Sequence, residues 1–142
     1  MNDMIEEITI ESGMTLNWKD FTGGTYVEHN GIFITDIGKG FVRGVVDIRP
    51  ELLNPLGVLH GGVVVTLADT VGIFGCGYLY EAVNVTTADL TVSFLRPVKT
   101  GRVHAVGKAL SQGRNLSLWR VDEYDDNENL VATVNVTYSI AK

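Results

Sequence analysis

The segment NPLGVLHGGVVVTLADTVG, residues 54–72, is a nearly continuous apolar run that contains one histidine, a pair of glycines and a single acid, Asp69. An ionised carboxylate is costly to bury unless it is paired or takes part in chemistry. Asp69 is therefore a candidate nucleophile or general base, the two roles that a carboxylate can have in acyl transfer. The alternative is an acid whose oxygens are satisfied by threonine or backbone donors.

The sequence His60-Gly61-Gly62 stands where a helix is expected to begin. A helix N-terminus offers unpaired N–H groups and a positive dipole end, and glycine lets a ligand approach the backbone closely. The Gly61 N–H is thus a candidate donor to an oxygen on which negative charge develops. A tight turn into the helix explains the two glycines equally well. His60 either orients this turn or binds near the substrate, and a structural histidine is the alternative.

The elements that must position these residues follow from the apolar pattern. Residues 61–80 predict one long buried helix, because twenty residues without a turn signal are too many for a typical strand. Residues 31–37 and 41–48 predict a hairpin around a Gly-Lys-Gly turn. Four further strands are expected after the helix, at 86–95, 102–111, 116–124 and 130–140.

The short connections between these four later strands predict an antiparallel meander. A six-stranded antiparallel sheet can cover one apolar helix if it curls around it, which gives an α+β fold. The length of the chain predicts a single domain over residues 1–142. Residues 1–30 are treated as an N-terminal extension, in which isoleucines at 5, 8 and 10 indicate a short helix or strand and residues 22–25 indicate a turn.

Five features of the chain match one known family: Asn54, His60-Gly61-Gly62, Asp69 nine positions after the histidine, TTADLTVSFLRPVKTG and LVATVNVTYSI. Together they resemble the hotdog-fold acyl-CoA thioesterases of the phenylacetate-pathway type, over about residues 31 to 140. The resemblance implies a curved antiparallel sheet wrapped around one long central helix. It also implies hydrolysis of acyl-CoA and active sites that straddle a dimer interface.

The resemblance implies roles for two residues outside the expected helix. Asn54 matches the family's asparagine and could hold the water or the carbonyl, although asparagine before proline is also an ordinary turn residue. Thr87 matches a position that often carries a serine or threonine to position the hydrolytic water. Simple β propensity explains Thr87 equally well, and Thr86 or Asp89 could face the site instead.

Coenzyme A carries phosphates, so an acidic protein that binds it should show a local basic cluster. Arg114, Asn115 and Lys108 surround a turn at Gly113. In the family, the matching loop lies near the nucleotide, so these three residues are the expected contacts with the CoA moiety. Solvated surface charge is the alternative explanation. No cofactor is expected, because coenzyme A is part of the substrate.

The spacing of the two candidate catalytic groups predicts a shared site. Gly61 and Asp69 are eight residues apart, so on one helix they lie about 12 Å apart along the axis. They cannot both touch one thioester carbonyl. Two antiparallel central helices in a two-fold dimer would bring each Gly61 near the partner's Asp69. This agrees with the dimer that the resemblance implies, and a homodimer that assembles into a tetramer is expected.

Composition bounds the remaining possibilities. The formal net charge of −6 argues against nucleic acid as a partner. The acidic N-terminus lacks a signal peptide's apolar region, and the longest apolar run is too interrupted for a membrane span. One cysteine, Cys76, excludes an intrachain disulfide and fits a reducing cytoplasm. With three scattered histidines it makes no usual zinc spacing, so no metal is expected.

The sequence thus predicts a cytoplasmic acyl-CoA thioesterase, with an aromatic or medium-chain acyl group as the leading expectation. One alternative is a hotdog hydratase or dehydratase, although these usually need a catalytic histidine in a different motif. The other is a non-catalytic acyl-CoA sensor. Known sensors of this fold carry a separate DNA-binding domain and tend to lack the acid, whereas this chain retains Asp69.

Overall fold

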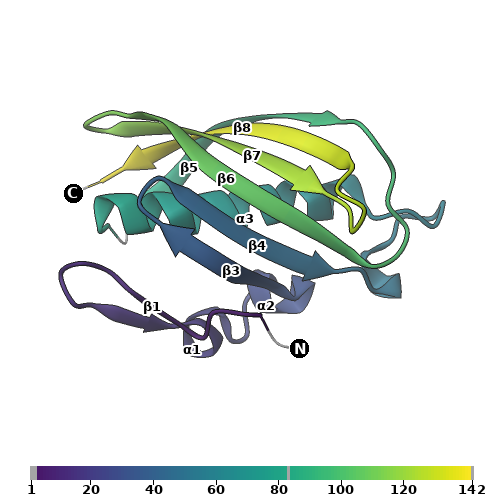
Figure 1. Cartoon of the computed structure of the whole chain (residues 1–142), viewed down its shortest axis with the longest axis horizontal. Helices are drawn as coiled ribbons and strands as arrows, with labels where there is room; N and C mark the ends of the chain where they lie inside the picture. The colour runs from purple at the N-terminus through teal and green to yellow at the C-terminus, as the bar shows by residue number, and fades with distance from the viewer. Residues whose placement is uncertain (1–2, 83, 142) are drawn as a thin grey trace.

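A six-stranded antiparallel sheet wraps around one long helix, α3 (Gly61–Tyr80), in the computed structural model, which describes residues 3–82 and 84–141 (Figure 1). The predicted α+β class and the predicted bounds of the helix are confirmed. The strands of the sheet run in the spatial order β3-β4-β6-β7-β8-β5. Their bounds are β3 (Ile32–Gly38), β4 (Phe41–Asp47), β5 (Val85–Phe94), β6 (Arg102–Gln112), β7 (Leu116–Tyr124) and β8 (Leu130–Ile140).

The predicted four-stranded meander is wrong in one respect. β6, β7 and β8 are consecutive neighbours, but β5 pairs with β8 at the far edge instead of with β6. The connection 95–101 crosses between them, and its Val98 carbonyl accepts a hydrogen bond from the Leu59 N–H at 2.7 Å. Seven residues can extend over about 23 Å, whereas three strand spacings measure about 14 Å. This connection is therefore long enough to cross the sheet and is not a tight turn.

The core lies between the inner face of the sheet and α3. Leu67, Ala68, Val71 and Cys76 of the helix are fully buried. The helix is long and apolar enough to cross a membrane by length and composition alone, and half of it is buried inside this fold. At Gly75 the helix approaches the sheet so closely that a Cβ would lie 2.7 Å from a Val42 methyl carbon. Glycine at this position lets the helix pack closely against the curved sheet.

The N-terminal extension folds against this core as two short strands and two short helices: β1 (Glu7–Thr9), β2 (Thr15–Asn17), α1 (Trp18–Thr22) and α2 (Tyr26–Asn30). It lies below β3 in the view of Figure 1. Asn17 caps α1 by accepting a hydrogen bond from the Asp20 N–H at 3.1 Å. A 3-10 turn, η1 (Pro50–Leu52), leads toward α3.

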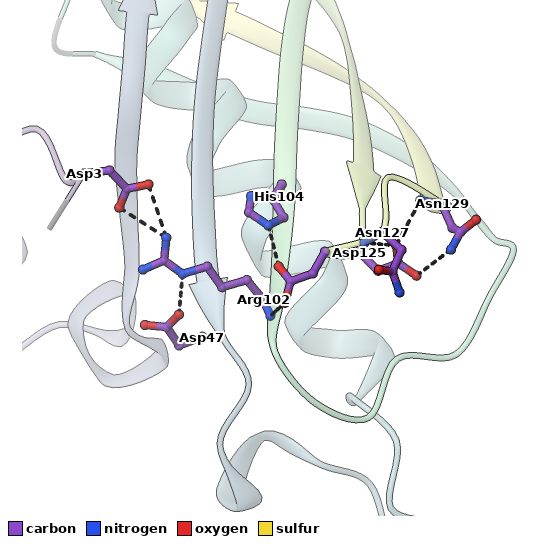
Figure 2. Close-up of polar contacts among 8 residues, drawn as sticks. Asp3, Asp47, Arg102, His104, Asp125, Asn127 and Asn129 are labelled. Carbon is purple, nitrogen blue, oxygen red and sulfur yellow. Dashed lines mark hydrogen bonds and ion pairs between the residues drawn. The ribbon is translucent and has the colours of Figure 1, made fainter. Parts of the chain in front are cut away.

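Polar contacts on the outer side of the sheet hold the start of the chain in place (Figure 2). The Arg102 guanidinium contacts Asp3 at 3.2 Å and Asp47 at 2.6 Å. Its hydrogen bond to Asp3 holds the pKa of that carboxyl below its usual value. His104 pairs with Asp126 at 2.8 Å on the same side. These groups are at least partly exposed, and their contacts with one another give them a structural role.

Candidate active site

α3 begins at the His60-Gly61-Gly62 sequence, as the glycine pair predicts. His60 is the N-cap, with φ −61° and ψ 134°, and its Nδ1 accepts a hydrogen bond from the Gly62 N–H at 2.7 Å. The His60 ring is exposed, and its hydrogen bond stabilises the turn at the start of the helix. Among the residues that the structure describes, the Gly61 N–H has no hydrogen-bond acceptor. It is a free donor at the positive end of a twenty-residue helix.

Gly61 faces a cavity of about 370 Å³, whose lining includes Val64, Phe94, Val98 and Val131. The Phe94 ring covers the α-carbon of Gly61, because a Cβ built there would lie 3.2 Å from two of its ring atoms. The walls of this cavity are mostly apolar. A negative charge developing near Gly61 would therefore sit in surroundings that strengthen its attraction to the N–H.

Asn54 shapes the loop before the helix. Its side-chain oxygen accepts hydrogen bonds from the Leu56 N–H at 3.0 Å and the Val58 N–H at 3.3 Å. The oxygen is thus engaged in the turn, which is the structural role that sequence alone offered as an alternative. A contact between Asn54 and the substrate stays a prediction. Because the side-chain oxygen is engaged in the turn, the side-chain amide nitrogen would have to make this contact.

Asp69 and Thr87 meet two turns along the helix from Gly61. The Thr87 hydroxyl on β5 donates to Asp69 Oδ1 at 2.6 Å, and both side chains are partly buried. Thr86 and Asp89 are exposed, so Thr87 is the residue of this strand that reaches the acid. The pair presents a carboxylate beside a hydroxyl, which is an arrangement that can hold and deprotonate a water molecule.

Tyr138 on β8 also contacts Asp69, through the backbone. Its hydroxyl donates to the Asp69 carbonyl at 3.1 Å and fits against Gly72, where any Cβ would collide with it. Burial, followed by the charge of Asp69, raises the pKa of this phenol far above its usual value, so Tyr138 stays protonated and donates. The sequence pattern does not predict this contact. The alternation of β8 places Tyr138 in the core, but nothing in the sequence pairs it with residue 69.

Gly61 and Asp69 lie on one continuous helix, as predicted, and about 12 Å separate them along its axis. They do not meet within the chain. The turn at Gly113 lies at the opposite end of α3 from Gly61, because the Tyr80 hydroxyl donates to the Gly113 carbonyl at 2.7 Å. Arg114, Asn115 and Lys108 are exposed around this turn.

The acid that is buried most completely is another residue that the predictions from sequence do not include. Asp69 is half-buried, whereas Glu123 on β7 is fully buried and its two oxygens have no hydrogen-bond partner among the described residues. Burial raises the pKa of Glu123 well above its usual range. Alternate residues of β7 point inward, so the period of two from Trp119 could have located it. In the described part of the chain, no three acids, histidines or cysteines lie close enough to hold a metal ion.

Residues 56–132 match the model of a known family, described as the thioesterase superfamily. The chain belongs to the thioesterase superfamily. The match includes Gly61, Asp69 and Thr87, and it begins just after Asn54. The hotdog fold and the family resemblance that the sequence predicts are confirmed.

Individual relatives agree with this assignment. The chain is 32% identical over 130 residues to the proofreading thioesterase EntH of Cronobacter sakazakii, a match that covers 89% of this chain and 94% of EntH. It superposes on the crystal structure of a Haemophilus influenzae thioesterase with a TM-score of 0.83 and 30% identity, over 89% of both chains. The PaaI protein of E. coli, from the phenylacetic acid degradation operon, shares the fold, with a TM-score of 0.80, 21% identity, and coverage of 88% of this chain and 90% of PaaI. The chain is therefore a thioesterase-family hydrolase.

Proposed function

We propose that this protein hydrolyses acyl-CoA thioesters to free coenzyme A and a carboxylic acid. The observation that carries the proposal is that α3 holds both Asp69, which is hydrogen-bonded to Thr87 of β5, and a Gly61 N–H that has no acceptor among the described residues. One group can activate an attacking oxygen and the other can stabilise the oxyanion. Both are needed to cleave a thioester.

Two routes use the same residues. As a general base, Asp69 accepts a proton from a water held beside Thr87, while the water oxygen bonds to the thioester carbon. As a nucleophile, a carboxylate oxygen of Asp69 forms a mixed anhydride that water then hydrolyses. In either case the Gly61 N–H stabilises the negative oxygen, and the C–S bond breaks to release the thiolate of coenzyme A. Neither route needs a cofactor or a metal.

The reaction requires two copies of the chain. The separation of Gly61 and Asp69 along α3 means that each site takes one group from each subunit, which a two-fold dimer of antiparallel helices provides. The position of β5 supports such a dimer. It is an edge strand of ten residues, one side of which pairs with no strand in the described part of the chain, and a second copy could cover it. We expect the dimer to assemble further into a tetramer.

The phosphates of coenzyme A are expected near the Gly113 turn. Lys108 and Arg114 carry positive charge, and within the described ranges neither makes an ion pair with a carboxylate. Their charges are therefore free for phosphate groups, and the Asn115 side chain adds a hydrogen-bonding group beside them. The overall charge of −6 makes nucleic acid an improbable partner, and we expect the protein to act in the cytoplasm without binding a membrane.

The test is a mixed dimer of two inactive variants. Gly61→Pro deletes the proposed oxyanion donor, and His60 already has the extended backbone that a residue before proline adopts. Asp69→Ala removes the acid. Each homodimer should release almost no thiol from acyl-CoA, whereas random one-to-one mixing should restore roughly a quarter of wild-type activity, because half the dimers have one good site in two.

Purifying the hybrid with two different tags makes this experiment decisive, provided that circular dichroism and size-exclusion chromatography show each variant folded and dimeric. A folded hybrid dimer without thiol release would refute the shared site. A wild-type protein that binds acyl-CoA but releases no thiol would refute the proposed hydrolysis and favour a sensor.

A further inference from the structure

A second cavity lies between the N-terminal extension and the C-terminal half of α3. Its volume is about 300 Å³, and it is separate from the cavity at Gly61. The extension supplies one wall through Met14, Leu16 and Phe21, while Ile73 of α3 and Val85 of β5 supply the opposite side. The lining is almost entirely apolar. Known ligand pockets begin at about this size and are mostly apolar.

The walls of this cavity are built by specific contacts. The Trp18 ring packs on the Phe74 ring with centroids 4.6 Å apart, and the Phe21 ring meets Phe74 edge-on at 5.7 Å. At the end of the cavity, the Ser12 N–H donates to a carboxylate oxygen of Glu81 at 2.8 Å. Glu81 is the charged residue of the lining, and this hydrogen bond occupies one of its oxygens.

Two residues of the cavity lining, Ile73 and Val85, are close in the chain to the Asp69–Thr87 pair, which is not itself part of the lining. Ile73 lies one turn along α3 from Asp69, about 6 Å along the axis and on the same face of the helix. Val85 is two residues before Thr87 and points to the same side of β5. An acyl group whose thioester carbonyl is held at Asp69 would have to extend by about one helical turn toward the C-terminal end of α3 to enter this cavity.

We propose that this cavity binds the acyl group of the substrate and that residues 8–21 of the N-terminal extension set its length. The inference rests on the proposed thioester hydrolysis and adds the substrate class, which is an apolar acyl group of aromatic or medium-chain size. The apolar walls favour such a group over a short or charged one, because burying apolar surface is favourable and burying an unpaired charge is not.

The experiment measures how the rate of thioester hydrolysis depends on the acyl group of the substrate and on substitutions in the cavity wall. Thiol release is measured for acetyl-, hexanoyl-, octanoyl-, dodecanoyl- and phenylacetyl-CoA with the wild type and three variants. Met14→Trp places a large side chain at the cavity wall, and Phe21→Ala enlarges the cavity. Leu118→Trp adds the same indole at a partly exposed position on β7 and serves as the matched control. Met14 and Phe21 are 48% and 59% exposed, so both variants should fold.

Met14→Trp should lower kcat/KM for octanoyl- and phenylacetyl-CoA by about tenfold or more and leave acetyl-CoA within about twofold of the wild type. Phe21→Ala should move the preferred chain length upward, and Leu118→Trp should leave the profile unchanged. A folded Met14→Trp protein with the wild-type profile would overturn the acyl cavity while hydrolysis itself stood. A wild type that cleaves none of the five thioesters would instead overturn the proposed function, and the acyl cavity with it.

Discussion

Replacing Glu123 with glutamine should remove a strong pH dependence from the stability of the fold. Glu123 lies on β7 between Ala105 and Ala132 of the neighbouring strands, fully buried and without a hydrogen-bond partner in the described part of the chain. Burial raises the pKa of its carboxyl well above the usual range, so the folded protein keeps the proton that the unfolded chain loses near pH 4.3. Glutamine has nearly the same shape and no titration.

The sign and the size of the effect follow from proton linkage. Above pH of about 4.3 the native state binds one more proton than the unfolded state, so the free energy of unfolding falls as the pH rises. The slope is roughly 1.4 kcal/mol per pH unit until the pH reaches the raised pKa of Glu123. The wild type should therefore lose stability relative to Glu123→Gln as the pH rises from about 4.3 toward the raised pKa of Glu123. Even one pH unit at this slope is a sizeable share of a typical domain's stability of about 5–15 kcal/mol.

Urea unfolding followed by tryptophan fluorescence measures this difference, because Trp119 lies on the same strand as Glu123 and is fully buried. Both proteins are unfolded at one protein concentration, since the stability of the proposed dimer would depend on it. Glu6→Gln, at an exposed position of the extension, is the control and should follow the wild type at every pH. Parallel stability curves for wild type and Glu123→Gln would refute the assignment, because Glu123 would then have the same protonation in both states.

Two further outcomes follow from the proposed chemistry. Asp69→Asn should lower kcat by at least about a hundredfold while leaving the protein folded, because an amide keeps the shape but can neither accept a proton nor attack. Thiol release near the wild-type rate would exclude Asp69 from the reaction. Arg114→Ala should raise KM for acyl-CoA far more than it changes kcat, and the effect should shrink at high salt. The same variant should hydrolyse an acyl-pantetheine thioester normally, so an equal loss on both substrates would remove Arg114 from the site.

The sequence predicts most of the elements because their signals are local. A glycine pair begins the helix, twenty residues without a turn signal sustain it, and alternation marks each strand. The orientation of Thr87 is not determined by such local signals. The register of β5 shifts between Thr87 and Asp89, so simple alternation along the strand cannot decide which residue faces the helix. The place of β5 beside β8 was missed for a related reason, since a strand pattern does not name its neighbour.

The contacts of Tyr138 and Glu123 depend on packing between distant segments. Residues 69 and 138 meet because β8 lies across the helix at Gly72, which only the folded sheet determines. Glu123 is an acidic residue at a core position. A search for buried positions that relies on apolar residues therefore does not identify it. Glu123 is thus a case in which the tertiary structure overrides the local preference of the residue type, whereas Tyr138 follows the alternation of β8 and finds its partner only in the folded sheet.

The eight-residue interval from Gly61 to Asp69 also constrains how this chain can vary in length. Each residue of a helix advances about 1.5 Å and turns about 100°. One residue inserted or deleted between these two positions would swing the carboxylate by that angle and away from Thr87. Because the two subunits of the proposed dimer carry the same interval, a single change of length would disturb both proposed active sites together. The loops before and after α3 have no such constraint, so insertions and deletions among related chains should fall there, while this interval should vary only by substitution.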